Sequence, residues 1–189
     1  MIRLETQRLF IRNWEDRDRD LFHRINADEK VMRFFPFRRT RAEADAFLDV
    51  LREDNAARGC GFAALEMKES ADAIGFAGLH PAGSIPPRPD GAVEIGWRLA
   101  PEHWGKGYVT EAGEELLRFG FETLGLGEIV SFAVQDNHES IAVMQRLGMR
   151  HEPQGDFDHP KVPDTHPHLK RHVFYTLCRD DWRKRKTAA

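Results

Sequence analysis

The segment Trp104-Gly105-Lys106-Gly107-Tyr108-Val109-Thr110-Glu111 guides the interpretation of this sequence. It follows a strand-like run from Val93 to Leu99 and begins a strongly helical run that continues to about Leu124. Two glycines one residue apart, at a strand-to-helix junction, free the backbone and leave amide N–H groups pointing outward. Such N–H groups, at the positive end of a helix, favour phosphate. The segment therefore predicts a phosphate-binding loop.

The composition is that of one globular domain, which we expect to span residues 1–189. Hydrophobic residues make up 41% of the chain and charged residues 31%, values typical of soluble proteins. The net charge of -3 indicates neither a nucleic acid nor a membrane partner, and no apolar run approaches the about 20 residues of a membrane span. Cys60 and Cys178 lie in strand-like runs. We therefore expect both cysteines to be reduced core residues and the protein to be cytoplasmic.

The N-terminal part predicts one strand and two helices. Arg8–Arg12 alternates as a strand does, and one of the aspartates in the segment 16–20 begins the first helix. Thr40, followed by Glu43 three residues later, is typical of a capping box. We expect the second helix to run from there to about Gly59.

The middle of the chain predicts an antiparallel meander followed by a parallel crossover. The expected strands are Cys60–Met67, Ala73–His80 and Ala92–Leu99, with a proline- and glycine-rich loop over Pro81–Gly91 between the last two. Ile129–Val134 reads as a buried strand. Because a helix separates it from the preceding strand, the two form a βαβ unit and the sheet is parallel there.

The last third predicts a short helix and two more strands. Asn137 and Ser140 begin the helix, and Gly148 ends it. A short strand near residues 149–151 and a closing strand at His172–Leu177 flank a loop. Taken together, these elements predict an α/β fold with one mixed sheet and helices on its faces.

Spacing excludes the two commoner phosphate loops. A P-loop needs GxxxxGK[ST], whereas Lys106 lies between the two glycines. A dinucleotide fingerprint needs a third glycine where Thr110 stands. The alternative to a phosphate site is that the glycines make only a tight turn.

Several motifs together resemble the GNAT acetyltransferase superfamily. Within it, the sequence looks closest to the branch of the ribosomal-protein alanine N-terminal acetyltransferases, the Rim-type enzymes. The matching segments are Leu4–Leu9, Glu94–Trp97, Trp104–Ala112, Asn137–Ser140, Met144–Met149 and His172–Tyr175. The resemblance implies a single-domain GNAT fold, whose mixed sheet splays between the fourth and fifth strands of the family and carries helices on both faces.

The resemblance also implies acetyl-CoA as the acyl donor. Backbone amides of Trp104–Val109 would hold its pyrophosphate, with the Thr110 hydroxyl added, while Lys106 either supplies charge from the rim or is simply solvated. The pantetheine arm would lie along the fourth strand of the family, where amides polarise the thioester carbonyl. The implied cofactor-binding residues are Ile95, Gly96, Trp97, Leu99, Trp104, Gly105, Lys106, Gly107, Tyr108, Val109, Thr110, Asn137, Ser140 and Met144.

The implied catalytic residues are Glu94, Ser140 and His80. Glu94 is the first choice for the base that takes the proton of the amine, the alternative being an exposed strand residue. His80 ends the preceding strand and ranks below it. Ser140 would hydrogen-bond or protonate the departing thiolate, where many family members use a tyrosine; the only tyrosines here are Tyr108 and Tyr175.

The amine acceptor is expected to be a protein or peptide N-terminus. Phe34, Phe35, Phe37 and His172 would line its site, although the aromatic residues also suit helix packing. The alternatives are a small-molecule acceptor (an aminoglycoside, a polyamine or an amino acid analogue) and a non-catalytic acyl-CoA sensor. We expect no functional metal, since the histidine-rich loop offers no defined cage, and a monomer or homodimer.

Overall fold

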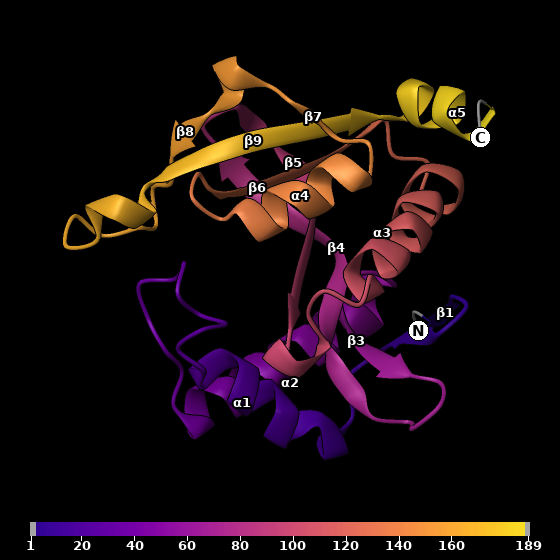
Figure 1. The fold of residues 1–189 in the computed structure, drawn as a ribbon, viewed down its shortest axis with the longest axis vertical. Helices are drawn as coiled ribbons and strands as arrows, with labels where there is room; N and C mark the ends of the chain where they lie inside the picture. Colours follow the sequence, from indigo (N-terminus) through magenta and orange to yellow (C-terminus); the bar gives the residue numbers. More distant parts are fainter. Residues whose placement is uncertain (1–2, 188–189) are drawn as a thin grey trace. The chain divides into compact units, whose positions relative to one another are not determined.

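The computed structural model describes residues 3–187 of the chain (Figure 1). These residues pack as two units. Unit 1 comprises the chain up to His80 together with Gly96–Glu115, and unit 2 comprises Pro81–Ile95 together with the chain from Leu116 onward. Strands β4 and β5 contribute residues to both units, and each unit is described by itself.

The secondary structure is a mixed sheet with five α-helices among the described residues. The strands are β1 Arg3–Glu5, β2 Leu9–Arg12, β3 Phe62–Met67, β4 Ala73–Ile85, β5 Arg88–Leu99, β6 Glu128–Val134, β7 Arg150–His151, β8 Phe157–Asp158 and β9 Arg171–Cys178. The helices are α1 Arg19–Ala27, α2 Arg41–Arg58, α3 Tyr108–Arg118, α4 His138–Arg146 and α5 Arg179–Thr187, with a π-helical turn at Phe119–Thr123. The strand order is β1-β2-β3-β4-β5-β6-β9-β7, with β8 paired to β9.

The pairing directions confirm the expected mixed sheet. Strands β1 to β4 pair antiparallel in sequence order. Strand β5 pairs parallel with β6, where Glu94 stands beside Val130. Strand β6 then pairs antiparallel with β9 along its whole length, from Glu128 opposite Cys178 to Val134 opposite His172. The parallel pair of β5 and β6 is the βαβ crossover that the sequence predicts.

Unit 1 is built on a core between the sheet and the adjacent helices α1 and α2 (Figure 1). Trp14 packs edge-on against Phe22, with ring centroids 4.8 Å apart. The capping box of α2 is confirmed: the Thr40 side chain accepts from the Glu43 N–H, and the helix ends at Gly59 in the left-handed conformation. The core residues are Trp14, Phe22, Ile25, Ala44, Leu48, Leu51, Ala64, Phe76 and Ala100.

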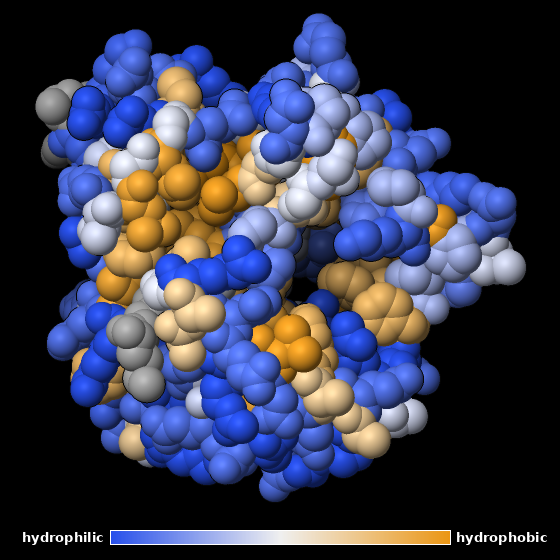
Figure 2. Space-filling view, turned by 180° about the vertical axis from the view of Figure 1, so that it is seen from behind, coloured by the Kyte–Doolittle hydropathy of each residue, from blue (hydrophilic) through white to orange (hydrophobic). Residues whose placement is uncertain are grey.

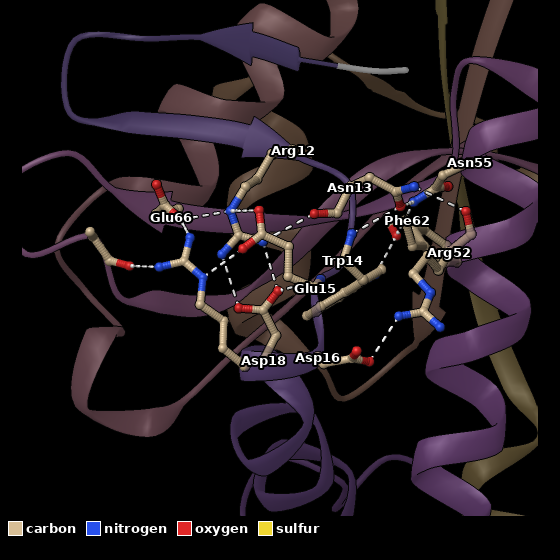
Figure 3. A network of polar contacts seen from close by, with 12 residues as sticks. Arg12, Asn13, Trp14, Glu15, Asp16, Asp18, Arg52, Asn55, Phe62 and Glu66 are labelled. Atoms are coloured by element: carbon tan, nitrogen blue, oxygen red, sulfur yellow. Dashed lines mark hydrogen bonds and ion pairs between the residues drawn. The ribbon is translucent and has the colours of Figure 1, made fainter.

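A buried ion network ties β2 and β3 to the start of α1 in unit 1 (Figure 3). The Arg12 guanidinium donates to both oxygens of Asp18 at 2.7 and 2.9 Å and to Glu66 Oε2 at 2.6 Å. Burial alone would lower the pKa of Arg12, but the hydrogen bonds to Asp18 and Glu66 outweigh it and raise that pKa. Fully paired in this way, the charges can be accommodated inside the unit.

Unit 2 has its own apolar cluster. Ile85, Val130, Phe157 and Phe174 are buried, and Phe132 packs against them. Cross-strand pairing places Phe132 opposite Phe174 on β9. Side chains at directly paired positions point to one face of a sheet, so this face of β6 and β9 is lined by apolar residues.

Three expectations are corrected by the structure. The predicted loop Pro81–Gly91 is mostly strand, because β4 runs to Ile85 and β5 begins at Arg88. Ala82, Ile85 and Ala92 pack on the unit 2 cluster, and this burial favours an extended hairpin despite its prolines. The chain after β9 forms α5, which the sequence analysis did not predict.

The third correction concerns the cysteines, which are free thiols, neither of which lies in the core. Cys60 is half-buried, and burial raises the pKa of its thiol. Cys178 is exposed at the end of β9.

Hydrophilic residues cover most of the surface shown in Figure 2, where hydrophobic residues gather in separate patches. Among residues 3–187, no helix combines the length and the apolar character that crossing a membrane requires.

Candidate functional site

The glycine loop lies in unit 1, where it opens α3. Gly105 and Gly107 both have left-handed backbones, with φ of +72° and +79°, a conformation that other residues adopt only with strain. The Trp104 N–H donates to Pro101 O at 3.1 Å, and the Glu111 N–H donates to Gly107 O at 3.0 Å. Between these bonds, the N–H groups of residues 105–110 donate to no other backbone group of the described chain. The loop therefore presents a run of free donors.

Three residues outside the predicted site hold this loop in place. Glu111 accepts from the Thr6 hydroxyl at 2.5 Å, from the Arg8 N–H at 2.7 Å and from Arg8 Nε at 2.6 Å. Arg8 Nη1 donates to Lys106 O at 3.0 Å, and its guanidinium lies 4.4 Å from the centre of the Tyr108 ring. Arg8 thus links the carbonyl of the loop to the first turn of α3.

The contacts among Thr6, Arg8 and Glu111 form a brace for the loop, and they favour a charged Glu111 beside the charged Arg8. Burial alone would raise the pKa of Glu111, but hydrogen bonds from Thr6 and Arg8 outweigh burial and lower it. The charge of Arg8 is therefore balanced by Glu111. The free N–H groups and the dipole of α3 remain to attract an anion.

The residues of the loop fit a phosphate group. The loop from Trp104 to Gly107 is exposed, and Thr110 is half-buried in the first turn of α3. A Cβ built on Gly105 would meet nothing within 4 Å, so the space beside that backbone is open. Lys106 is exposed, and no described residue forms a hydrogen bond or ion pair with its side chain that would hold it away from an anion.

Glu94 lies on β5 in unit 2, facing a largely apolar environment. Its register with Val130 puts it on the face of the sheet that carries the apolar cluster. Burial raises the pKa of Glu94 to about 7, against a smaller opposite effect of the Lys161 charge. No other described residue within residues 3–187 hydrogen-bonds to this carboxyl group. A carboxyl group that titrates near neutral pH without a partner has the properties of a general base.

The backbone that follows Glu94 is partly occupied. Ile95 is buried, and its carbonyl accepts from Ser131 Oγ at 2.9 Å. The Leu99 carbonyl accepts from Trp104 Nε1 at 2.9 Å. A Cβ at Gly96 would lie 2.9 Å from the Phe62 ring, so packing alone requires a glycine there. Trp97 is half-buried.

The residues predicted on α4 are positioned by its first turn in unit 2. Asn137 is the N-cap, and its Oδ1 accepts from the Ser140 N–H at 3.2 Å, which confirms the capping role. Both side chains are half-buried. Met144 is only 1% exposed and belongs to the interior of the unit, so its predicted cofactor contact has little surface to act through.

The two predicted histidines have packing roles in the structure. In unit 1, the His80 ring stacks on Phe62, with centroids 5.0 Å apart. In unit 2, His172 is 8% exposed, donates from Nδ1 to Lys170 O at 2.8 Å and stacks on Phe157. Burial lowers the pKa of His172.

The aromatic connector, residues 34–37 between α1 and α2 in unit 1, is accessible. Phe35 is 37% exposed and Phe37 43% exposed, with their ring centroids 6.0 Å apart. Phe34 is half-buried beneath the Arg33 guanidinium. These rings present an apolar surface to solvent, as a binding wall requires.

The predicted residues therefore divide between the units. Unit 1 holds the glycine loop, Gly96 to Leu99, His80 and the aromatic connector, whereas unit 2 holds Glu94, Ile95, the residues on α4, and His172. Two surface hollows of unit 1, of about 490 and 620 Å³, are lined by none of the predicted residues. Within the described part of the chain, no group of three histidine, cysteine or acidic side chains is placed to hold a metal ion.

Sequence reasoning missed the roles of Thr6, Arg8 and Glu111. Thr6 and Arg8 stand in a segment that matched the family, and Glu111 stands in the loop motif. A shared motif was thus the available signal. Their pairing over 103 to 105 positions was not visible in a single sequence.

Comparison with known proteins identifies a family. The model of the acetyltransferase (GNAT) domain matches residues 8–150. An uncharacterized N-acetyltransferase of Bacillus subtilis, YnaD, is 30% identical over 158 residues, which cover 79% of this chain and 83% of the relative.

Solved structures share the fold at low sequence identity. The ribosomal-protein-S5-alanine acetyltransferase from Vibrio fischeri has a TM-score of 0.71 and 18% identity, over 96% of this chain and 99% of its own. The spermidine N-acetyltransferase from Vibrio cholerae, solved with CoA and spermine, has a TM-score of 0.71 and 19% identity, over 92% and 97%. One fold therefore serves acceptors of very different chemistry.

Proposed function

The chain belongs to the GNAT acetyltransferase family and is an acetyltransferase, and we propose that it transfers acetyl from acetyl-CoA directly to the N-terminal amine of a peptide or protein. The observation that carries the proposal is the braced glycine loop with its free N–H groups at the start of α3. We propose that residues 1–189 act as one such domain. The acyl donor of the family is acetyl-CoA, which supplies an activated thioester.

The loop is proposed to bind the pyrophosphate of acetyl-CoA. Several amide donors at a helix start can share a doubly charged group without a metal ion. The side chains of Lys106 and Thr110 would add one charge and one hydroxyl. Arg8 and Glu111 would act as positioning residues, since their charges are already paired.

Glu94 is proposed to accept the proton that the attacking amine loses. The amine must be neutral to attack, and a base with a pKa of about 7 is half-ionised at neutral pH. His80 is the weaker candidate because its ring is stacked on Phe62. The apolar surroundings of Glu94 support its role, because they keep a proton-accepting group without a competing partner.

Ser140 is proposed to donate a hydrogen bond to the departing thiolate. Its backbone N–H donates to the capping Asn137, and no described residue hydrogen-bonds to its hydroxyl, so the hydroxyl can act on the thiolate. Neither tyrosine suits this role as well as Ser140 does. Tyr175 is 5% exposed and stacked on His151, and Tyr108 lies under the guanidinium of Arg8.

The peptide acceptor rests on the Rim-type motifs and on the likeness to an enzyme named for a ribosomal protein. The rival is a small-molecule amine, which the likeness to a spermidine enzyme supports. A sensor that binds acetyl-CoA without turnover is not proposed, because the chain belongs to a family of acetyltransferases. The two acceptors make different experimental predictions.

The test is acetyl-CoA-dependent thiol release, measured over a panel of peptides, polyamines and aminoglycosides. We expect release with peptides that bear a free N-terminus and none with the same peptides formylated at that amine. Release only with a small-molecule amine would replace the peptide acceptor. Tight binding of acetyl-CoA with no release on any amine would identify a sensor.

The variant Glu94→Gln tests the base. It should lower kcat at pH 7 by about 100-fold, the usual contribution of a general base, while the affinity for acetyl-CoA changes little. Glu122→Gln is the matched control, since Glu122 is 52% exposed and pairs only at the surface with Arg118. An unchanged rate in Glu94→Gln would remove this residue from the mechanism.

A further inference from the structure

Arg98 is a charged residue of unit 1 that the proposed mechanism does not use. It lies near the end of β5, with its guanidinium 4.4 Å from the centre of the Phe35 ring and 5.2 Å from that of Phe76. Arg98 Nη1 donates to Asn26 Oδ1. Asn26 is fully buried and neutral, so it accepts a hydrogen bond without balancing the charge.

Arg39 is a second arginine of unit 1, and its charge acts on Arg98. Its guanidinium lies 4.9 Å from the centre of the Phe37 ring and 4.3 Å from that of Phe47. Its Nε is buried and has no hydrogen-bond partner in the described structure. A buried donor left without an acceptor costs free energy, so a ligand that reached this N–H would supply the acceptor that it lacks.

The two guanidinium groups are neighbours without a counter-ion. They cover the adjacent rings of Phe35 and Phe37, whose centroids are 6.0 Å apart. Burial, together with the smaller effect of the positive charge of Arg39, lowers the pKa of Arg98 to about 9. Burial likewise lowers the pKa of Arg39. The negative charge of Glu43 opposes this shift from a distance, because the Glu43 carboxylate accepts a hydrogen bond from Thr40 and forms no ion pair with Arg39. No carboxylate of the described chain forms an ion pair with either arginine.

We propose that Arg39 and Arg98 form a binding site for a carboxylate group carried by the amine acceptor. Two planar guanidinium forks, with unused N–H donors and an aromatic floor, match the bidentate geometry of a carboxylate. Phe35 and Phe37, which border the two guanidinium groups, are themselves exposed. The site rests on the proposed acetyltransferase function only in naming the acceptor as the molecule that carries the carboxylate.

The chemistry of the site separates acceptor classes. A peptide with an acidic side chain, or an amino acid with a free carboxylate, brings the charge that the two arginines lack. A polyamine brings only positive charge, which the arginines repel. The site therefore favours acidic peptide or amino acid acceptors over polyamines.

The binding test uses anions alone, so that it does not depend on turnover. The Nε–H resonances of Arg39 and Arg98 are followed by NMR while succinate, inorganic phosphate or chloride is added at matched ionic strength. We expect saturable shifts with succinate and none beyond the ionic-strength effect with chloride. In Arg39→Gln the succinate affinity of the Arg98 resonance should fall at least about tenfold, the contribution of a charge-assisted pair.

Two further variants keep this test decisive. Arg98→Lys retains the charge but loses the fork, and should bind succinate more weakly than the unchanged protein. Arg58→Gln is the control for net charge, because Arg58 lies at the exposed end of α2 and pairs only with Asp54; it should bind as the unchanged protein does. Succinate shifts no larger than those of chloride, or saturation by phosphate alone, would overturn the carboxylate site.

The acceptor assignment is tested by paired peptides, Ser-Asp-Ala-amide and Ser-Asn-Ala-amide. We expect kcat/KM to favour the acidic peptide by about 10- to 100-fold, and this ratio to fall to within about threefold in Arg39→Gln but not in Arg58→Gln. If no amine is acetylated, the proposed function fails and the NMR titration still decides the site. Turnover with equal rates on both peptides would overturn the acceptor assignment.

Discussion

Arg12 and Arg98 are two arginines in strands of unit 1 with opposite electrostatic surroundings. Arg12 on β2 is bound by Asp18 and Glu66, and these partners raise its pKa (Figure 3). Arg98 on β5 has a neutral asparagine and two aromatic rings, and its pKa is lowered. Arg12 is 9% exposed and Arg98 is half-buried, yet only Arg12 has its charge balanced by carboxylates of the described chain.

The difference separates a structural charge from one that awaits a ligand. A buried ion with all its partners costs little to keep, whereas an unbalanced one costs free energy in every molecule. Glu111 belongs with Arg12, since Thr6 and Arg8 satisfy its carboxylate. Glu94 belongs with Arg98, because no described residue pairs with it. The predictions below test this division.

The largest expected effect follows from removing Arg12. Arg12→Leu leaves Asp18 and Glu66 buried without their cation, so we expect the free energy of unfolding to fall by about 3–5 kcal/mol. Urea denaturation measures this loss. Arg17→Leu is the control, because Arg17 is 52% exposed and shares Glu66 from the surface; it should cost about 1 kcal/mol or less. A loss below 1 kcal/mol in Arg12→Leu would break the comparison.

The next effect is a dependence of stability on pH at Glu94. The folded pKa of about 7 lies above the ordinary 4.5, so the folded state holds a proton that the unfolded state loses first. The contribution of Glu94 to the free energy of unfolding is therefore fully present below pH 4.5 and is lost as the pH rises to about 7. Glu94→Gln should therefore be about 2 kcal/mol more stable than the unchanged protein at pH 8, and equally stable at pH 4.

The measurement for Glu94 is urea denaturation at both pH values. Glu122→Gln serves again as the control and should show no difference between them. If Glu94→Gln and the unchanged protein were equally stable at pH 8, the Glu94 carboxylate would have a stabilising partner in the folded protein, and the prediction would be wrong.

A smaller effect is expected at the brace of the glycine loop. Glu111→Gln removes the charge that holds Arg8, and so loosens the loop conformation that presents its N–H groups. We expect the Kd for acetyl-CoA to rise about tenfold, equivalent to one charge-assisted hydrogen bond. Calorimetry measures this, with Glu122→Gln as the unaffected control. An unchanged Kd would show that the glycines alone set the loop.

The smallest effect sharpens the comparison most directly. Arg39→Gln removes an unbalanced charge whose Nε has no partner in the described structure, but it also removes the contacts of the guanidinium with Phe37 and Phe47. Because these two effects oppose each other, we expect the free energy of unfolding to change by no more than about 0.5 kcal/mol. Set beside Arg12→Leu, this measures what the missing counter-ion is worth. A loss above 2 kcal/mol would place Arg39 among the structural arginines.

The sequence predicted those features that depend on neighbouring residues. The capping box at Thr40, the cap at Asn137 and the glycine turn before α3 are local and were confirmed. The buried strand β6 was recognisable from its apolar run. Local features of this kind can be predicted because they depend only on residues within one helical turn or one strand of each other.

Features that depend on distant partners were not predictable. The brace joins Arg8 to Glu111 across 103 positions, and the Arg39 and Arg98 pair depends on which rings fold beneath them. The hairpin over Pro81–Gly91 was misread because prolines suggest a loop, whereas burial of Ala82 and Ala92 on the unit 2 cluster favours strand. In each case tertiary contacts, absent from a single sequence, decide the outcome.

The unequal burial of the two thiols has a practical consequence. Cys178 is exposed, whereas Cys60 is half-buried with a raised pKa and so offers less of the reactive thiolate at neutral pH. A maleimide dye added in slight excess should therefore attach first to Cys178, without any engineered cysteine. The native chain thus carries a single-site attachment point for a fluorescent reporter at the junction of β9 and α5.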